Sequence, residues 1–410
     1  MAGFLLVDSA VGIIQKYVGI HIPVSMIYKT PVLLLLLLII ALRDPKFTLW
    51  ILAAFLCFIT GPVIQLLSFN DPSALFYDIT LALKILSPIL YLRYFMIAAD
   101  EIPDFFRQAA PKILVLSCAI FIANMLAGLL GLGFPSYSTG GQDVGINGFF
   151  IAGNEMGAVF VILAAFALTK AFHHSLKLYS LAAIVIIVIG VLIATKASML
   201  ASIILVSFLP VFIGGKKALR PTMPKIVISV LVILIMGIML SAFIDILKNA
   251  GFWTRLVWIY EEHGILRLIL SSRDEFAMAL FAIFSEHGQW YNWLLGMSSA
   301  SAKHYWIATK LVAEVDPIDV VIIFGFVGLS AALMVQFHLL RHVLHWYQIK
   351  RSQLAPACLL SFLLLQALAF TSGHIWLSGM MGPFLGLMFG LCYLDSRNQA
   401  SALLSVSTQK

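Results

Sequence analysis

Residues 271–319 read SSRDEFAMALFAIFSEHGQWYNWLLGMSSASAKHYWIATKLVAEVDPID, and they form most of the one long polar interruption in an otherwise apolar chain. The whole interruption runs from Lys248 to Asp319 and holds 14 of the 45 charged residues (26 basic and 19 acidic). A loop this long inside a compact domain is usually functional. We therefore predict that residues 248–317 form a large loop outside the cytoplasm that caps a site between two helices.

The rest of the chain has the composition of a membrane protein. Hydrophobic residues make up 61% of the 410 residues and charged residues only 11%, and the mean hydropathy is +1.01. About a quarter of the residues of a soluble protein are charged. The net charge of +7 does not indicate a nucleic-acid partner, because basic residues in such chains lie mostly in cytoplasmic turns.

Apolar runs long enough to cross a bilayer recur along the sequence. A spanning helix needs about 20 apolar residues, and runs of this length exclude an outer-membrane barrel, whose strands alternate apolar and polar residues. The N-terminus has neither a basic start nor a small-residue cleavage site, so we expect no removable signal peptide. The pattern predicts an all-α polytopic membrane protein, a single membrane domain over residues 1–410, with about 12 transmembrane helices at residues 3–21, 24–42, 47–67, 75–98, 112–133, 148–170, 177–194, 197–213, 226–247, 318–341, 354–372 and 375–394.

Lysine and arginine in the short loops set the expected orientation. Three connections are basic and contain no acidic residue, at 170–177, 214–225 and 341–353. With twelve spans all three fall on the cytoplasmic side, together with both termini. The loops 68–74, 134–147 and 248–317 then lie on the opposite, extracytoplasmic side.

Two basic residues are candidates for binding phosphate on that outer side. Arg273, in SSRDEF, offers a fixed planar fork of donors that matches phosphate oxygens. Lys196, in the turn ATKAS, presents a point charge at the bilayer surface. The alternatives are a surface salt bridge from Arg273 to Asp274 or Glu275, and a simple interfacial anchor for Lys196.

Three further polar residues lie in or near apolar runs, where ionisable groups are costly and tend to mark sites. Lys84 lies inside the run DITLALKILSPIL, and Asn154 and Glu155 stand near the outer end of the run at 148–170. We predict that all three bind substrate. The alternatives are snorkelling of Lys84 or its pairing with Asp78, and a helix-cap role for Glu155.

His304, in SAKHYW, is the candidate general base, because its ordinary pKa suits proton abstraction near neutral pH. Glu314 or Glu155 would support His304 in this role. Tyr305 would stack on a sugar or belong to an interfacial aromatic belt. Metal binding is not expected, because no second histidine or cysteine stands at ligand spacing from His304. The cysteines all lie in apolar runs and make neither a disulfide framework nor a metal site: Cys57, Cys118, Cys358 and Cys392.

Five short fragments follow one another between about Gly148 and Gly328, and their order is informative: GFFIAGNE, ATKASML, SSRDEF, LLGMSSASAKHYW and AEVDPIDVVIIFGFVGL. This order resembles the O-antigen polymerase and ligase family, the membrane glycosyltransferases of bacterial surface polysaccharides. The ligase branch typically has arginine where this chain has Lys196, so the resemblance favours the polymerase branch.

The resemblance implies a GT-C-like helical glycosyltransferase with a large periplasmic loop. It implies a place in the bacterial inner membrane, with both termini cytoplasmic and the active site facing the periplasm. The donor would be an undecaprenyl-diphosphate-linked oligosaccharide, with no cofactor and no metal. Membrane lipid and a chain-length regulator or a flippase are the other implied partners.

The residue types fit that chemistry. Expulsion of a lipid diphosphate from an anomeric carbon builds negative charge on the bridging oxygen, which fixed cations such as Arg273 and Lys196 stabilise. The acceptor hydroxyl needs a base, for which we predict His304. We expect a polysaccharide polymerase, with a ligase as the alternative. A lipid-linked oligosaccharide flippase or transporter, the alternative of another class, would have two similar halves, which this sequence does not have.

Overall fold

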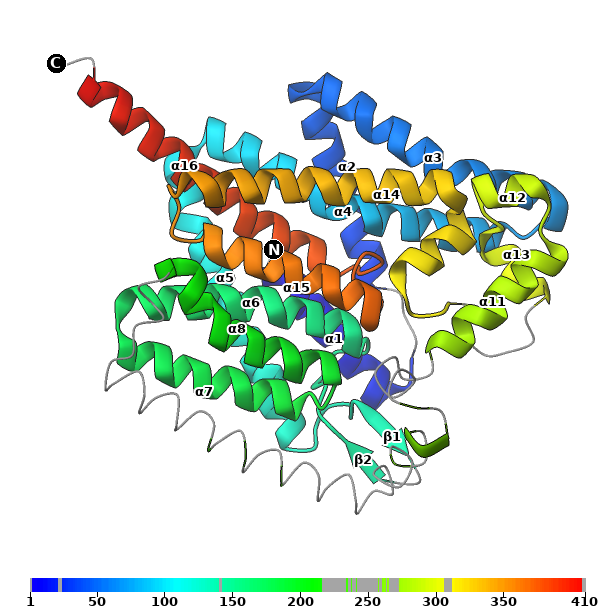
Figure 1. The fold of residues 1–410 in the computed structure, drawn as a ribbon, viewed down its shortest axis with the longest axis horizontal. Helices are drawn as coiled ribbons and strands as arrows, with labels where there is room; N and C mark the ends of the chain where they lie inside the picture. Colours follow the sequence, from blue (N-terminus) through cyan, green and yellow to red (C-terminus); the bar gives the residue numbers. More distant parts are fainter. Residues whose placement is uncertain are drawn as a thin grey trace.

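The structure is a computed structural model, and it describes residues 2–20, 24–139, 142–215, 273–305 and 312–407 together with single positions from 234 to 264. Within these ranges the chain forms a bundle of helices with one small antiparallel hairpin (Figure 1). The all-α fold class predicted from the sequence is therefore confirmed.

The N-terminal part is a run of helices joined by short turns. Two of the turns hold an aspartate followed by proline: Asp44 caps one helix by accepting the N–H of Phe47 at 3.1 Å, and Asp71 caps the next by accepting that of Ala74 at 3.1 Å. Both residue types are typical of helix starts. The helices are α1 (Ala2–Val18), α2 (Val24–Arg43), α3 (Pro45–Phe69), α4 (Pro72–Glu101) and α5 (Pro103–Leu129).

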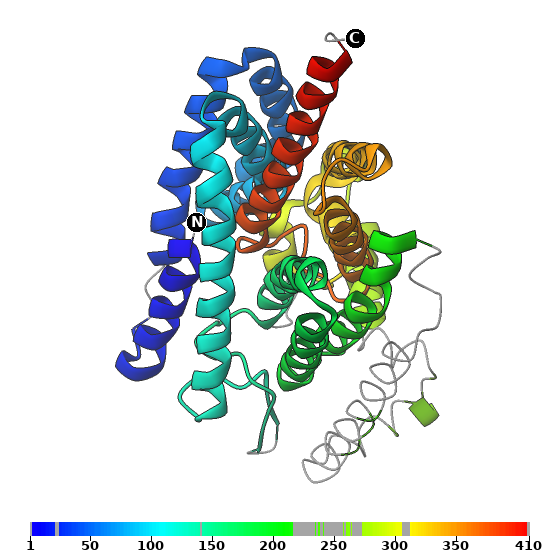
Figure 2. The same cartoon turned by 90° about the vertical axis from the view of Figure 1, so that its left-hand side faces the viewer.

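A hairpin and three helices follow. The hairpin pairs β1 (Tyr137–Thr139) with β2 (Gln142–Val144), and Figure 2 shows it beyond the end of α5. The helices are α6 (Gly153–His174), α7 (Leu176–Leu192) and α8 (Lys196–Gly214). Helix α6 is buried almost all round, from Met156 to Phe166, as expected for a central helix of a bundle.

The described part of the predicted loop 248–317 is helical and packs on the bundle. It contains α11 (Arg273–His287), α12 (Trp290–Leu295) and α13 (Ser298–Tyr305). The buried carboxylate of Asp78 on α4 fixes the start of α13, because it accepts the hydroxyl of Ser298 at 2.5 Å and the N–H of Ser299 at 3.1 Å. Asp78 is thus bound to α13 and not to Lys84.

The last three helices are α14 (Asp316–Ile349), α15 (Ala355–Thr371) and α16 (Met381–Ser407). Helix α16 packs along α4, and α14 packs against α3 and α15. Helix α14 kinks at Gly325, where φ is +67°, and the bend is visible in Figure 1. A Cβ at Gly325 would lie 2.3 Å from the carbonyl oxygen of Leu294, so only glycine lets the end of α12 approach α14 this closely.

Six of the described helices are long and apolar enough to cross a membrane: α3, α4, α5, α6, α8 and α14. Each overlaps one of the runs predicted from the sequence, and the protein is a multi-pass membrane protein. Helices α7 and α15 are apolar but shorter, with 17 residues each. The predicted loop 214–225, the predicted span 226–247 and the first part of the predicted loop, 248–272, lie largely outside the described residues.

Candidate functional site

The segment 372–380 connects α15 to α16, and a buried carboxylate from α14 holds its first half. Asp316 accepts the backbone N–H groups of His374 at 2.6 Å, Ile375 at 2.8 Å and Trp376 at 2.8 Å. Asp316 is fully buried, and an ionised carboxylate is stable there only with such donors. The connecting segment is therefore fixed in one conformation that presents His374.

Residues from the first turn of α6 hold both ends of this segment. Glu155 accepts the N–H of Gly379 at 2.8 Å and the hydroxyl of Ser378 at 3.2 Å, while the side-chain amide of Asn154 donates to the carbonyl of Ser372 at 3.3 Å. Lys84 of α4 lies 3.4 Å from Glu155. The sequence predicts that these three residues bind substrate, and the structure places them together with contacts to the protein itself.

Arg273, Glu314 and His374 meet where α11 and α14 begin and α15 ends. Nη2 of Arg273 lies 3.0 Å from a carboxylate oxygen of Glu314, and Nη1 donates to the carbonyl of Thr371 at 3.3 Å. The other carboxylate oxygen of Glu314 lies 4.0 Å from Nε2 of His374. We call Lys84, Glu155, Arg273, Glu314 and His374 the charged cluster.

The two segments that carry Glu314 and His374 are in close contact, and both residues have an uncommon backbone conformation. Glu314 has φ of +59° and His374 has φ of +57°, both in the left-handed region. Gly373 also has φ of +62°, and a Cβ there would lie 2.2 Å from the carbonyl oxygen of Glu314. Such strain costs of order 1–3 kcal/mol per residue and tends to gather at functional sites.

Lys196 is the first residue of α8, after the cap Thr195. Its charge lies close enough to Arg273 for the two cations to repel each other. Since Asn154 and Asp316 stand in the first turns of α6 and α14, the N-termini of three helices, α6, α8 and α14, converge here. Each N-terminus carries about half a positive charge, so the helices favour an anionic ligand as the two side-chain cations do.

A cavity of about 500 Å³ lies beside the charged cluster, between α1, α2, α4 and the start of α6. Its lining is mainly apolar and includes Phe76, Leu83 and Phe150. Two ion pairs interrupt that lining, Lys84 with Glu155 and Lys29 with Asp8, the latter at 2.8 Å. The cavity therefore combines an apolar wall with a charged corner, which suits an amphipathic ligand.

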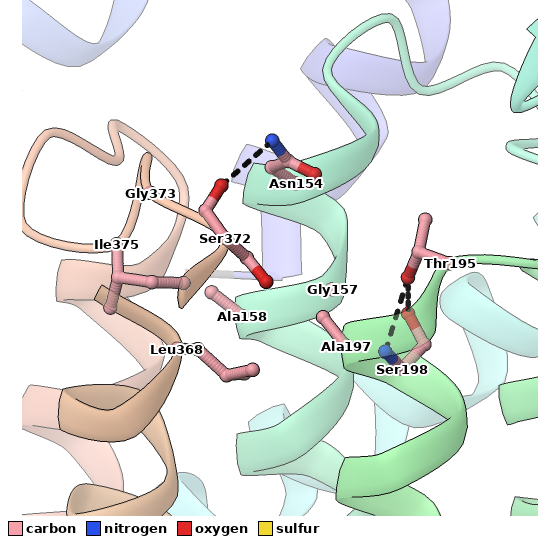
Figure 3. Close-up of a pocket in the computed structure, with 10 residues that line it drawn as sticks. All are labelled: Asn154, Gly157, Ala158, Thr195, Ala197, Ser198, Leu368, Ser372, Gly373 and Ile375. Atoms are coloured by element: carbon pink, nitrogen blue, oxygen red, sulfur yellow. Dashed lines mark hydrogen bonds between the residues drawn. The ribbon is translucent and has the colours of Figure 1, made fainter. Parts of the chain in front are cut away.

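A second, very small cavity of about 10 Å³ lies on the other side of Asn154 (Figure 3). It is enclosed by α6, α8, the end of α15 and the first residues of the connecting segment. In Figure 3 the amide of Asn154 points to Ser372, and Thr195 is bonded to Ser198 at the start of α8. A space of this size holds about one water, so it serves packing rather than substrate binding.

His304 and Tyr305 lie at the end of α13, beside the end of α3. The imidazole of His304 is exposed and lies 5.2 Å from the Phe69 ring, between centroids. The ring of Tyr305 stacks on His287 at 4.1 Å. His304 therefore packs against α3, whereas His374 lies beside Glu314. The histidine of the charged cluster is His374, not His304, which the sequence predicts as the base.

The local charges favour the protonated form of His374. Burial lowers its pKa, but the hydrogen-bonding carboxylate of Glu314 and the charges of Asp316 and Glu155 outweigh that effect and raise the pKa above its ordinary value of 6.5. A histidine oriented by a carboxylate is the usual arrangement of a general base.

From the sequence, His374 in the turn TSGH belongs to the polar groups expected on the outer face, but neither His374 nor Asp316 is assigned a catalytic or binding role. The signal for such a role is weak: TSGH has a glycine and a histidine between two apolar runs, and Asp316 is an acid at the start of one. Comparison of the sequence with protein-family models gives no match, and comparison with curated proteins gives none either.

Proposed function

We propose that this protein is a membrane glycosyltransferase, a polysaccharide polymerase that moves a glycan from an undecaprenyl-diphosphate donor to a hydroxyl of a lipid-linked repeat unit. The observation that carries the proposal is the convergence of Arg273, Lys196 and the N-termini of α6, α8 and α14 beside a largely apolar cavity. A diphosphate needs such a positive field, and a prenyl chain needs apolar surface within the bilayer.

The proposal includes the finer architecture. The chain would have about twelve spans in a GT-C-like arrangement in a bacterial inner membrane, with both termini cytoplasmic. Residues 248–317 would cap the site on the periplasmic side. The side of the bilayer follows from the basic loops, and the short motifs resemble those of the O-antigen polymerase and ligase family.

The reaction is a displacement at the anomeric carbon. The acceptor oxygen forms a bond to that carbon while the bond to the diphosphate oxygen breaks, and its electron pair stays on the diphosphate. Arg273 and Lys196 would stabilise the charge that develops there. The proton of the acceptor hydroxyl would pass to Nδ1 of His374, because the other ring nitrogen, Nε2, faces Glu314 at 4.0 Å and would be oriented by it.

Arg273 already has an anionic partner, so donor binding would change the cluster. A diphosphate that bonds to Arg273 competes with Glu314, which then becomes available to His374. We expect binding of the donor to strengthen the Glu314–His374 contact, which is 4.0 Å long in the free protein. Catalytic hydrogen bonds are often long before substrate binds.

The surface glycan of a deletion strain tests the proposal. A polymerase mutant should carry a single repeat unit on its lipid core. A mutant with no glycan on the core and with lipid-linked polymer accumulating would instead indicate a ligase. A glycan of normal length would refute both activities.

One observation favours a transporter as the second candidate. The two ion pairs at the membrane cavity, Lys29 with Asp8 and Lys84 with Glu155, have side-chain exposures of only 9–29%, and buried pairs often mark transport routes. Purified protein with lipid-linked repeat units separates the two candidates. A transferase releases free polyprenyl diphosphate as polymer forms, whereas a transporter releases none.

A further inference from the structure

A separate cavity of about 240 Å³ lies near the other end of α14, between that helix, α4 and the start of α3. Its polar residues are Asp44, Arg93, His338 and His342. On α4, Arg93 follows Lys84 of the charged cluster by nine residues, which corresponds to roughly 14 Å at 1.5 Å per residue. The cavity shares no lining residue with the charged cluster, and the proposed reaction does not use it.

Arg93 of α4 lines this cavity, and its side chain is 31% exposed. Its Nη2 pairs with Asp44 at 2.5 Å, and Asp44 also caps α3. The Nε–H of Arg93 is buried and meets no acceptor within the part of the chain that the structure describes. The guanidinium has five N–H donors in all, more than the carboxylate of Asp44 accepts.

The two histidines add one donor beside the same cavity. Their Nε2 atoms lie 3.1 Å apart, so one ring donates to the other, and the ring that accepts at Nε2 carries a proton on Nδ1 that is left for another acceptor. The ring of His338 packs near Trp50 at 5.6 Å, and that of His342 stacks on Trp346 at 5.6 Å. The positive charges of Arg93 and Arg341 act on both imidazoles.

This environment selects against a metal cation and for an anion. Arg93 lines the cavity with the histidine pair, the charge of Arg341 also acts on both rings, and the nearby carboxylate of Asp44 is already bonded to Arg93 and to the start of α3. The rest of the lining is apolar and includes Phe47, Ile89 and Met96. An anionic group attached to hydrocarbon fits both surfaces, and Arg93 provides the donor geometry that phosphate prefers.

We propose that this cavity, beside the turn between α2 and α3, binds a phosphate group that is supplied by a phospholipid headgroup or by free phosphate. The test uses the full-length protein, delipidated in detergent, and native mass spectrometry with two probes. Dioleoyl phosphatidic acid and dioleoylglycerol differ only in the phosphate, so retention of the first but not the second is expected. Equal retention of the two probes overturns the proposal.

Variants tie that binding to the cavity. Arg93→Gln should weaken retention of phosphatidic acid roughly 10-fold or more, as expected for loss of a charge-assisted hydrogen bond. The matched control is Arg43→Gln at the same end of the bundle, because Arg43 pairs with Glu101 at 3.0 Å and its side chain is 59% exposed. Retention by Arg93→Gln equal to that of the unmodified protein refutes the assignment.

A second variant covers the case in which Arg93→Gln does not fold. The double variant His338→Gln, His342→Gln leaves the Arg93–Asp44 pair intact and should still lose several-fold in retention. Inorganic phosphate then distinguishes the two sources, since displacement of phosphatidic acid at millimolar phosphate shows that the free anion suffices. Without displacement, the lipid headgroup is the ligand. Zinc binding that the double variant abolishes, with retention of phosphatidic acid unchanged, counts against the proposal.

Discussion

Glu314 bonds the guanidinium of Arg273 at 3.0 Å and lies 4.0 Å from Nε2 of His374. Its side chain and that of Arg273 are 19% and 14% exposed, so solvent screens the pair only partly. The salt bridge to Asp274 or Glu275 considered from the sequence is therefore not the pairing that fixes Arg273 to α14. Glu314 therefore links Arg273, the candidate for binding phosphate, to His374, the candidate general base.

Arg273→Ala should reduce polymer formation at least about 100-fold, because removing one stabiliser of developing negative charge typically costs that much. Arg273→Lys should lose less, since lysine keeps the charge but not the planar fork. The measurement is chain length and rate at matched expression. Lys303→Ala is the control, because Lys303 forms an exposed pair with Asp71 at 3.3 Å. Normal chains in Arg273→Ala would remove Arg273 from the site.

His374→Ala should cost about 100-fold or more in rate if His374 is the general base. His304→Ala is the matched imidazole control, because His304 is exposed at the end of α13. Initial rates with a defined acceptor compare the two variants. If His304→Ala shows the large loss and His374→Ala does not, the base is on α13, as the sequence alone predicts.

The pH dependence of the rate should follow the raised pKa of His374. A base accepts a proton only in its neutral form, so activity should be full above this pKa and should fall as the pH drops through it. The midpoint should lie above the ordinary 6.5, because Glu314 and Asp316 overcome the effect of burial. Glu314→Gln removes the largest raising contact and should shift the midpoint to lower pH. An unchanged midpoint would show that another group is titrated.

At the scale of elements, the connecting segment 372–380 depends on carboxylates from two other helices. Asp316 from α14 bonds three backbone N–H groups, and Glu155 from α6 bonds the N–H of Gly379. Both acids stand in the first turn of a helix, where negative charge is favourable. The ends of α6, α14 and α15 are thus fixed to one another through a segment without regular structure.

Gly373→Ala should destabilise the protein more than Gly131→Ala. Both glycines have positive φ, +62° and +73°. A Cβ at Gly373 would lie 2.2 Å from the backbone of Glu314, whereas a Cβ at Gly131 would meet nothing within 4 Å among the described residues beyond its chain neighbours. Gly131→Ala therefore carries only the cost of the backbone conformation, about 1 kcal/mol. Thermal unfolding in detergent should rank the variants in this order. Equal melting temperatures would mean that Glu314 and the connecting segment separate easily.

At the scale of the whole molecule, α14 connects the two polar sites. It starts at Asp316, which bonds the connecting segment beside the charged cluster, and it passes His338 and His342 before it ends at Ile349. The kink at Gly325 lies against the end of α12. Since one helix connects the two sites, the orientation of α14 in the bilayer decides which compartment each site faces.

Thiol labelling tests that orientation. Single cysteines at Leu130 and Gln348, in a background that lacks the four natural cysteines, occupy exposed positions near opposite ends of the bundle. An impermeant maleimide added to intact spheroplasts should label Leu130→Cys and leave Gln348→Cys unlabelled until the membrane is opened. The opposite pattern would place the charged cluster on the cytoplasmic side.

The sequence alone determined that this is an all-α membrane protein and where most long helices lie, because about 20 apolar residues in a row have no other stable place than a bilayer. It also singled out Arg273, Lys196, Lys84, Asn154 and Glu155, because polar groups stand out against an apolar background. Only the tertiary structure decided their partners. Glu314 and His374 lie 60 residues apart in the chain and meet because α14 begins beside the end of α15. Hydrogen bonds between distant segments leave no periodic trace in a sequence, so the choice between His304 and His374 depended on the fold.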